Sequence, residues 1–187
     1  MDTKERILDQ SRGLFNRQGT RAVTTNHIAK SLEMSPGNLY FHFHNKEEIL
    51  RQLFSEMSRR SLRAVWSKMQ PQELVESQLR LAWEYRFFHR EMYELRRRDP
   101  KLGQLWKQHL NAFKRRVAVL WRSWNRSRVF VGPGLEIDEE SFFNLLLMST
   151  AASLQVFESE KRSAREDVLD RTRELTLKLL GIRKSVS

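Results

Sequence analysis

An all-α fold is the class that this sequence of 187 residues predicts, and three observations support it. Glycine and proline are scarce, with seven and four residues, while long stretches are rich in the helix-favouring Leu, Glu, Arg and Ala. Apolar residues recur at helical spacing along the chain. No stretch sustains the alternation of apolar and polar residues that marks a half-buried strand.

Residues 3–18 form the first expected helix. Asp2 or Thr3 can cap its start, and Gly19 just beyond it is a typical C-terminal stop. The inward side follows the spacing of one helical face, with Ile7, Leu8, Ser11, Leu14 and Phe15.

Two shorter helices follow, joined by the three-residue turn Glu-Met-Ser. Thr24 is the expected N-cap of a helix from Thr25 to about Leu32. Ser35 caps the next helix, which ends near His42, and Pro36 takes its first position, where a missing N–H costs no hydrogen bond. This is a helix-turn-helix pattern, and its second helix normally enters the major groove of DNA. The sequence thus predicts a three-helix, helix-turn-helix headpiece.

The stretch SPGNLYFHFHNKEE, residues 35–48, crowds rings beside a proline and a glycine. Leu39 and Phe43 can pack inward at i, i+4 spacing, which leaves Asn38, Tyr40 and other polar or aromatic side chains outside. Such a surface suits contact with bases and phosphates, and Gly37 would let the backbone approach DNA closely.

Asn45 is the expected cap of a helix that runs to about Met69 before Pro71. Glutamates in its first turn suit the helix dipole, but Lys46 does not. We therefore expect a phosphate partner for Lys46, with a merely solvated lysine as the alternative.

Further helices are expected at about 72–97, with a kink near His89, and at 101–127. A Gly-Pro-Gly loop follows, and then helices at about 138–158 and 164–181, the last stopped by Gly181. Helix 138–158 is apolar on more than one side and must be buried on several faces. Together with the last helix it is expected to form half of a four-helix dimer interface, with a monomer core as the alternative. The residues expected there are Phe143, Leu147, Ala151, Leu154, Val168, Thr172, Leu175 and Leu179.

The composition narrows the class of protein. The absence of cysteine excludes disulfides and cysteine-based zinc sites, and it permits the cytoplasmic location that we expect. The N-terminus lacks the apolar region of a signal peptide. The longest apolar run is too short for a bilayer and contains Asn144, so no membrane partner is expected.

The formal charge of +11 favours a polyanionic partner such as nucleic acid. The charge is +3 in residues 1–46, +2 in 47–70, +8 in 71–130 and −2 in 131–187. The excess is thus greatest in the middle of the chain, which a basic DNA headpiece alone does not predict.

Residues 24–50, TTNHIAKSLEMSPGNLYFHFHNKEEIL, resemble the TetR family of bacterial transcriptional regulators. The family pattern is roughly T-x-x-x-I-A followed by S-x-G-x-[LI]-Y-x-[HY]-F-x-x-K-E-x-L. The matching residues are Thr24, Ile28, Ala29, Ser35, Gly37, Leu39, Tyr40, His42, Phe43, Lys46, Glu47 and Ile49 or Leu50.

The resemblance implies a set of DNA contacts. Family positions that contact phosphate or the DNA backbone correspond to Thr25, His27, Tyr40, His42 and Lys46. Family positions that face or contact bases or sugars correspond to Asn26, Pro36, Gly37, Asn38 and Phe41. Pro36 departs from the polar or basic residue of many members, so DNA shape is expected to carry more of the specificity.

The resemblance also implies a domain division and a function. Residues 1–46 would bind DNA, 47–70 would form a connecting helix, and 71–187 would form a helical bundle for effector binding and dimerisation. We expect a repressor that binds a near-palindromic operator as a homodimer, uses no cofactor and is released by a small amphipathic effector. The aromatic residues that could line the effector pocket, or simply pack a core, are Trp83, Phe87, Phe88, Trp106, Phe113 and Trp121. The +8 charge of this region favours an anionic effector.

Three rival classes fit less well. A metal site at His27, His42 and His44 lacks a suitably spaced carboxylate, and an i, i+2 pair diverges on a helix. An enzyme would need a nucleophile with a base, paired carboxylates or metal ligands, and none stands out. An RNA or membrane-surface binder could use the charge but would not need the helix-turn-helix register.

Overall fold

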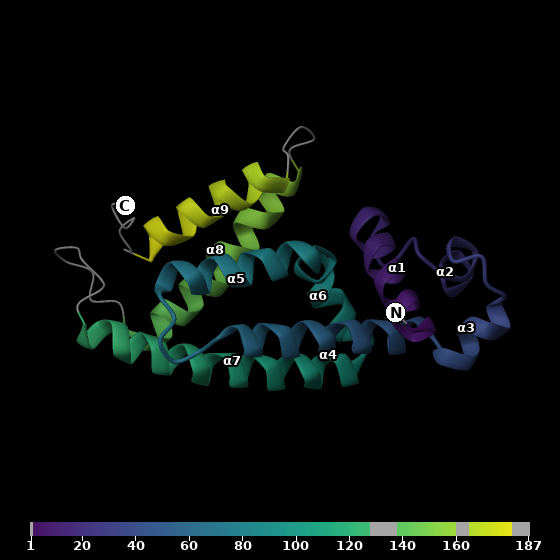
Figure 1. Ribbon diagram of the computed structural model, residues 1–187, viewed down its shortest axis with the longest axis horizontal. Coiled ribbons are helices and arrows are strands. Elements are labelled where there is room, and N and C mark those ends of the chain that lie inside the picture. The colour runs from purple at the N-terminus through teal and green to yellow at the C-terminus, as the bar shows by residue number, and fades with distance from the viewer. Residues whose placement is uncertain (1, 128–137, 160–164, 181–187) are drawn as a thin grey trace. The chain divides into compact units, whose positions relative to one another are not determined.

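The computed structural model describes residues 2–127, 138–159 and 165–180, with 153–159 and 165 described as backbone only. This described part consists of α-helices without strands, so the all-α prediction is confirmed (Figure 1). The helices are α1 (Thr3–Gln18), α2 (Thr25–Ser31), α3 (Pro36–His42), α4 (Lys46–Ala64), α5 (Pro71–Glu84), α6 (Arg86–Arg98), α7 (Pro100–Arg126), α8 (Glu139–Ser159) and α9 (Arg165–Leu179).

Local capping explains why the first helices begin where the sequence predicts. The Asp2 carboxylate accepts a hydrogen bond from the Glu5 N–H at 2.7 Å, and the Glu5 carboxylate accepts one from the Asp2 N–H at 3.0 Å. This capping box satisfies two N–H groups that the helix itself leaves unpaired. Helix α1 ends before Gly19, whose φ of +79° suits a residue without a Cβ.

Helix α4 ends at Ala64, so the prediction that it continues to Met69 is wrong. Val65 and Met69 are buried, so the apolar pattern persists through a turn rather than a helix. The Arg116 guanidinium of α7 donates hydrogen bonds to the carbonyl oxygens of Leu62 and Val65. Such a contact satisfies carbonyls that the last turn of a helix leaves unpaired.

The single helix expected at 72–97 is two helices, and the break lies at Tyr85 rather than near His89. Tyr85 is fully buried, and its hydroxyl accepts a hydrogen bond from Arg12 at 3.4 Å. At the start of α6, the Phe87 N–H donates to the Asn16 Oδ1 at 3.2 Å. Residues distant in the sequence therefore bond the polar groups at the break. This explains why no local glycine or proline marks it in the sequence.

Packing divides the chain into two units. The first unit comprises Met1–Arg59 and Tyr85–His109, and the second comprises Arg60–Glu84 and Leu110–Ser187. Helices α4 and α7 contribute residues to both. The functional division at residues 46 and 70 is a separate prediction and follows neither boundary. The loop expected after Arg126 and the stop expected at Gly181 lie at 128–137 and 181, outside the described residues.

Aromatic and aliphatic side chains fill both cores. In the first unit Phe15, Phe43, Phe54, Phe87 and Phe88 are all essentially inaccessible to solvent. In the second unit α5, α7, α8 and α9 surround a core that includes Leu74, Phe113, Trp124, Phe142 and Val168.

Candidate nucleic-acid interface

Helices α2 and α3 are each fixed at their N-termini by a hydroxyl cap. The Thr24 Oγ1 accepts a hydrogen bond from the His27 N–H, and the Ser35 Oγ accepts one from the Asn38 N–H, both at 3.2 Å. Between the two helices Glu33 adopts a φ of +53°, a left-handed conformation that tightens the turn. This is the geometry of a helix-turn-helix (Figure 1).

The inward side of the motif is apolar and closed. Ile28 and Ala29 of α2, together with Leu39 and Phe43, are buried, as the spacing predicted. The remaining side chains of α3 lie outside. Pro36, Gly37 and Asn38 are exposed, and the exposed fractions of Tyr40 and Phe41 are 45% and 82%. The outer side of α3 thus presents two adjacent rings beside the exposed Asn38, which is a surface open to a partner.

Gly37 has no packing reason to be a glycine. Among the described residues, an added Cβ would meet only the Ser35 Oγ, at 4.0 Å. A glycine in a helix costs roughly 1 kcal/mol relative to alanine, and nothing in this unit requires it. Close approach of an outside surface to the backbone of α3 would explain it.

Two hydroxyl groups lie side by side where α2 and α3 meet. The Thr25 Oγ1 and the Tyr40 hydroxyl are 3.1 Å apart and hydrogen-bonded. Hydroxyl groups are frequent phosphate ligands, so this pair can bind one phosphate oxygen. Asn26 and His27 are exposed beside it, and His42 is half-buried with its ring edge-on to Phe41 at 5.3 Å.

Lys46 is engaged within the protein. Its Nζ donates hydrogen bonds to the Thr20 carbonyl oxygen at 2.7 Å and to the Val23 carbonyl oxygen at 2.9 Å. An ammonium group has three N–H donors, so one remains for another partner. The phosphate contact of Lys46 therefore stays a prediction, but its contact with the turn before α2 does not depend on DNA.

Two neighbouring residues of α6, which sequence reasoning missed, also bind this region. The Arg90 Nη2 donates to the carbonyl oxygens of Phe15 and Asn16 at 3.1 and 2.9 Å. The Glu91 carboxylate accepts from the Thr20 N–H and from its Oγ1. No local pattern could have found them, because their partners lie more than 70 residues away in the chain.

The rings expected to line an effector pocket fall into both units rather than one cluster. Phe87, Phe88 and Trp106 belong to the first unit. Phe54 joins them, with ring centroids 5.5 Å from Phe88 and 5.8 Å from Trp106. In the second unit, Phe113 is buried and Trp83 and Trp121 pack partly buried against the core. Core packing thus accounts for most of these rings.

Two polar groups lie among the rings of the first unit. The Arg96 guanidinium stacks over Trp106 at 5.4 Å, and its Nε is buried without a hydrogen-bond partner in the described part of the chain. The His109 Nδ1 is 2.9 Å from the Ser58 Oγ, and burial lowers the pKa of His109 to about 4. Burial likewise lowers the pKa of His89 to about 4. A neutral histidine and a cation thus share an aromatic setting.

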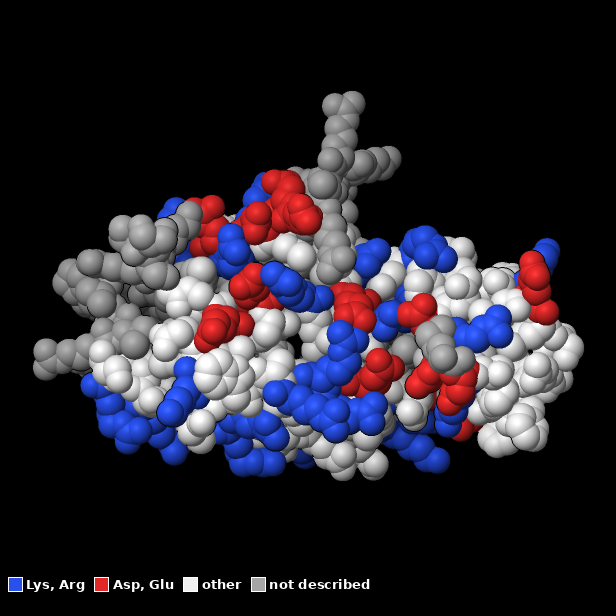
Figure 2. Space-filling view, in the orientation of Figure 1, with Lys and Arg blue, Asp and Glu red and all other residues white. Residues whose placement is uncertain are grey.

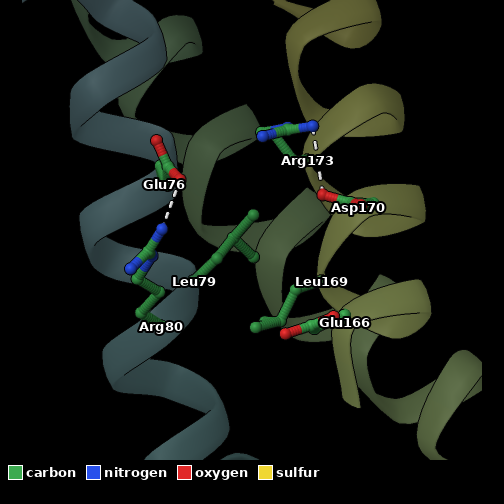
Figure 3. Close-up of a pocket in the computed structure, with 7 residues that line it drawn as sticks. All are labelled: Glu76, Leu79, Arg80, Glu166, Leu169, Asp170 and Arg173. Carbon is green, nitrogen blue, oxygen red and sulfur yellow. Dashed lines mark hydrogen bonds and ion pairs between the residues drawn. The ribbon is translucent and has the colours of Figure 1, made fainter. Parts of the chain in front are cut away.

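An open groove of about 400 Å³ runs between α5 and α9 in the second unit (Figure 3). Its charged side chains are largely paired, with Arg80 to Glu76 at 2.7 Å and Arg173 to Asp170 at 3.0 Å. Leu79 and Leu169 point toward the space between the helices (Figure 3). None of the six expected rings lines this groove, so it is not the apolar pocket that the sequence predicted.

The excess positive charge of residues 71–130 lies mainly on solvated surface. Lysine and arginine side chains gather over α7 in Figure 2. The exposed basic residues of this helix are Lys101, Lys107, Arg115, Arg116, Arg122 and Arg126. The regional charge alone is therefore weak support for an anionic pocket.

The residues expected at a dimer interface divide into buried and exposed sets. Phe143, Val168 and Thr172 are buried in the core of the second unit. Leu175 and Leu179 are 42% and 53% exposed, and Met148, which was not among the expected residues, is 69% exposed. Leu147 and Ala151 are half-buried, and the Leu154 side chain lies outside the described residues.

The described residues contain no group of three or more histidine and acidic side chains placed to hold a metal ion. Within the same residues, no helix combines the length and the apolar character that crossing a membrane requires.

Comparisons with known proteins agree with this geometry. A family model described as bacterial regulatory proteins of the tetR family matches residues 7–53, and one described as bacterial transcriptional repressor matches residues 46–180. The HTH-type transcriptional regulator QacR of Staphylococcus aureus is 27% identical over 128 residues, which cover 60% of this chain and 68% of QacR. UidR of Escherichia coli is 35% identical over 60 residues, covering 32% of this chain and 31% of UidR.

A solved structure supports the whole-chain match. The TetR-family regulator from Marinobacter aquaeolei VT8 aligns with a TM-score of 0.82 at 28% identity, covering 96% of this chain and 89% of that one. The two family models together extend from the helix-turn-helix to α9. The chain belongs to the TetR family of bacterial transcriptional regulators.

Proposed function

We propose that this regulator is an effector-responsive repressor that binds a near-palindromic operator as a homodimer. The observation that carries the proposal is the outer surface of α3, where Asn38 and Phe41 are exposed beside the hydroxyl pair of Thr25 and Tyr40. Because bacterial chromosomal DNA lies in the cytoplasm, we expect the protein to act there.

Each exposed group of α3 has a matching partner in a major groove. The Asn38 amide suits the paired donor and acceptor of an adenine edge, and the Phe41 ring suits a thymine methyl group. Pro36 and Gly37 offer no hydrogen-bonding side chain, so part of the specificity falls to DNA shape. The Thr25 and Tyr40 hydroxyls would fix the register by binding phosphate.

A duplex selected by the wild-type protein from a random-sequence pool tests this surface. Asn38→Ala should cost about 1–3 kcal/mol and relax the preference at one base pair of each half-site. Tyr40→Phe should weaken binding to selected and scrambled duplexes alike, because phosphates carry no sequence. Asn111→Ala, at an exposed asparagine of α7, is the matched control. Wild-type affinity and selectivity in Asn38→Ala would contradict the proposal.

Dimerisation is proposed through the exposed apolar side chains of α8 and α9. Met148, Leu175 and Leu179 are large and lie in solvent in the single chain. Two-fold related headpieces require matching half-sites, which is why we expect a near-palindrome. The buried residues among those predicted at the interface, such as Phe143 and Val168, would support this surface from within.

An amphipathic, anionic effector is proposed to release the DNA. The support is the buried and unpaired Nε of Arg96 over the Trp106 ring, since a carboxylate or phosphate would satisfy that donor. A ligand shifts a conformational equilibrium only by its differential affinity for the two states. A coupling of about 1–3 kcal/mol between effector and DNA is therefore expected.

A further inference from the structure

We propose that Glu91 of α6 is a positioning residue for operator binding, and that it acts on the DNA-contacting end of α2 through Thr20. The inference rests on the proposed DNA-binding function and adds a residue that neither the helix-turn-helix motif nor α3 contains. Glu91 is not expected to touch DNA.

Thr20 is held on both sides by ionised side chains. Its N–H donates to the two Glu91 carboxylate oxygens at 3.2 and 3.0 Å, and its Oγ1 donates to the Glu91 Oε2 at 2.5 Å. On the other side, its carbonyl oxygen accepts from the Lys46 Nζ at 2.7 Å. Hydrogen bonds to charged groups are shorter and stronger than neutral ones. Because Thr20 is also buried, its position is closely fixed.

The turn is shaped around the Glu91 carboxylate. Gly19 has a φ of +79°, and a Cβ added there would lie 3.2 Å from the Glu91 Oε1. The positive φ favours glycine, and a side chain at this position would also press on the carboxylate. Glu91 is thus a structural part of this turn rather than a solvated acid near it.

The fixed turn leads directly to the candidate phosphate contacts. Lys46 also binds the Val23 carbonyl oxygen at 2.9 Å, and Val23 is fully buried. The next residue, Thr24, caps α2, and Thr25 holds the Tyr40 hydroxyl. Loosening Thr20 would therefore loosen the segment that aims the hydroxyl pair.

Loss of Glu91 should leave the rest of the first unit folded. Arg90 independently binds the carbonyl oxygens of Phe15 and Asn16, and Phe87 packs on Phe15 with ring centroids 5.3 Å apart. Helix α6 thus keeps its attachment to α1. The effect of a Glu91 variant is confined to the turn before α2.

The sign of the change in affinity separates positioning from charge. Glu91→Gln removes a negative charge from a protein that binds a polyanion, so electrostatics alone would strengthen binding. Positioning predicts the opposite. Glu94→Gln is the matched control, because Glu94 lies on the same helix and is exposed. Its ion pairs within the described residues are long, at 3.9 Å to Arg97 and to Arg98.

The experiment measures binding of the full-length variants to the selected duplex. Glu91→Gln should weaken binding by about three- to tenfold, while Glu94→Gln leaves it unchanged or strengthens it. The dependence on salt should keep its slope, since no phosphate contact is lost. Amide hydrogen exchange should quicken in residues 20–27 and not in α1 or α6.

Thr20→Val provides a second variant without any change of charge. It removes the hydroxyl bond to Glu91 and should weaken binding in the same direction, and the double variant with Glu91→Gln should fall short of the sum of the two. Equal affinities for Glu91→Gln and Glu94→Gln would overturn the inference, as would lower stability with unchanged affinity of the folded protein. A wild-type chain that selects no duplex would overturn the proposed function and this inference together.

Discussion

Lys46 shows that one side chain can match a family motif and still have a role that the motif does not state. The sequence predicted a phosphate contact because a lysine does not suit the first turn of a helix. The structure gives Lys46 two carbonyl partners, Thr20 and Val23, that lie 26 and 23 residues earlier. Leu39 and Phe43 were predictable because their reason, an i, i+4 face, is local.

Lys46→Met should therefore affect stability as well as DNA binding. We expect the free energy of unfolding to fall by about 1–3 kcal/mol, the range for hydrogen bonds to charged groups. Urea denaturation of the free protein measures this, and Lys30→Met, at an exposed lysine of α2, is the control. If Lys46 acts only on phosphate, stability will not change and the salt slope of DNA binding will fall by about one unit.

The ends of helices were predictable where their capping residues are local. The starts of α1, α2 and α3 follow from Asp2, Thr24 and Ser35, each of which accepts a hydrogen bond from the first turn. The end of α4 at Ala64 and the break at Tyr85 depend instead on Arg116 and Asn16, which are distant in the sequence. The helix propensity of a short stretch of sequence does not depend on such distant partners, so it cannot predict these two positions.

His89 of α6 and His109 of α7 are half-buried, and their protonation opposes folding. Burial lowers the pKa of His89 and of His109 to about 4, whereas the ordinary value is about 6.5. As the pH falls below about 6.5, these histidines become protonated in the unfolded chain but stay neutral in the folded chain. The histidine contribution to stability is thus full above that pH and is lost progressively toward pH 4.

Urea denaturation between pH 7.5 and 4.5 tests this window. His109→Phe, among the rings of Phe54 and Trp106, should flatten the loss of stability relative to the wild type. His44→Gln, at an exposed histidine, should leave it unchanged and so corrects for the titration of acidic groups. An identical loss in wild type and His109→Phe would show that His109 is protonated freely in the folded state.

At the scale of the whole molecule, the net charge overstates the number of basic side chains whose donors are all open to DNA. Lys46, Arg90 and Arg116 keep their charges, but each donates hydrogen bonds to backbone carbonyl oxygens of the protein itself. The family was predictable because the residue pattern of the helix-turn-helix motif is specific to it. The all-α fold was predictable because the composition favours helices. The division into two packing units was not predictable, because it depends on the contacts of residues 85–109 with α1 and its following turn.

Dimerisation is tested by a charge on the exposed face of α9. Leu175→Glu should yield monomers in sedimentation and weaken binding to the selected duplex, because a buried unpaired carboxylate opposes association. Val119→Glu introduces the same charge at an exposed apolar residue of α7 and should remain a dimer. A wild-type protein that sediments as a monomer at micromolar concentration would contradict the proposal.

The effector proposal is tested by following tryptophan fluorescence and DNA release together. Fatty acids and acyl thioesters should release the duplex, and hydrophobic cations should not. Arg96→Gln should weaken the response to anions, whereas Arg97→Gln, at an exposed neighbour, should not. Release by neutral or cationic compounds alone would refute the anionic ligand, and no response across a broad library would refute the effector site.

The contact between Gly19 and Glu91 also constrains how relatives of this protein can diverge. A larger residue at position 19 would press on the carboxylate and strain a backbone at φ +79°, so position 19 cannot gain a side chain while this turn keeps its geometry. Relatives that carry a larger residue at position 19 should therefore also have a differently shaped turn before α2.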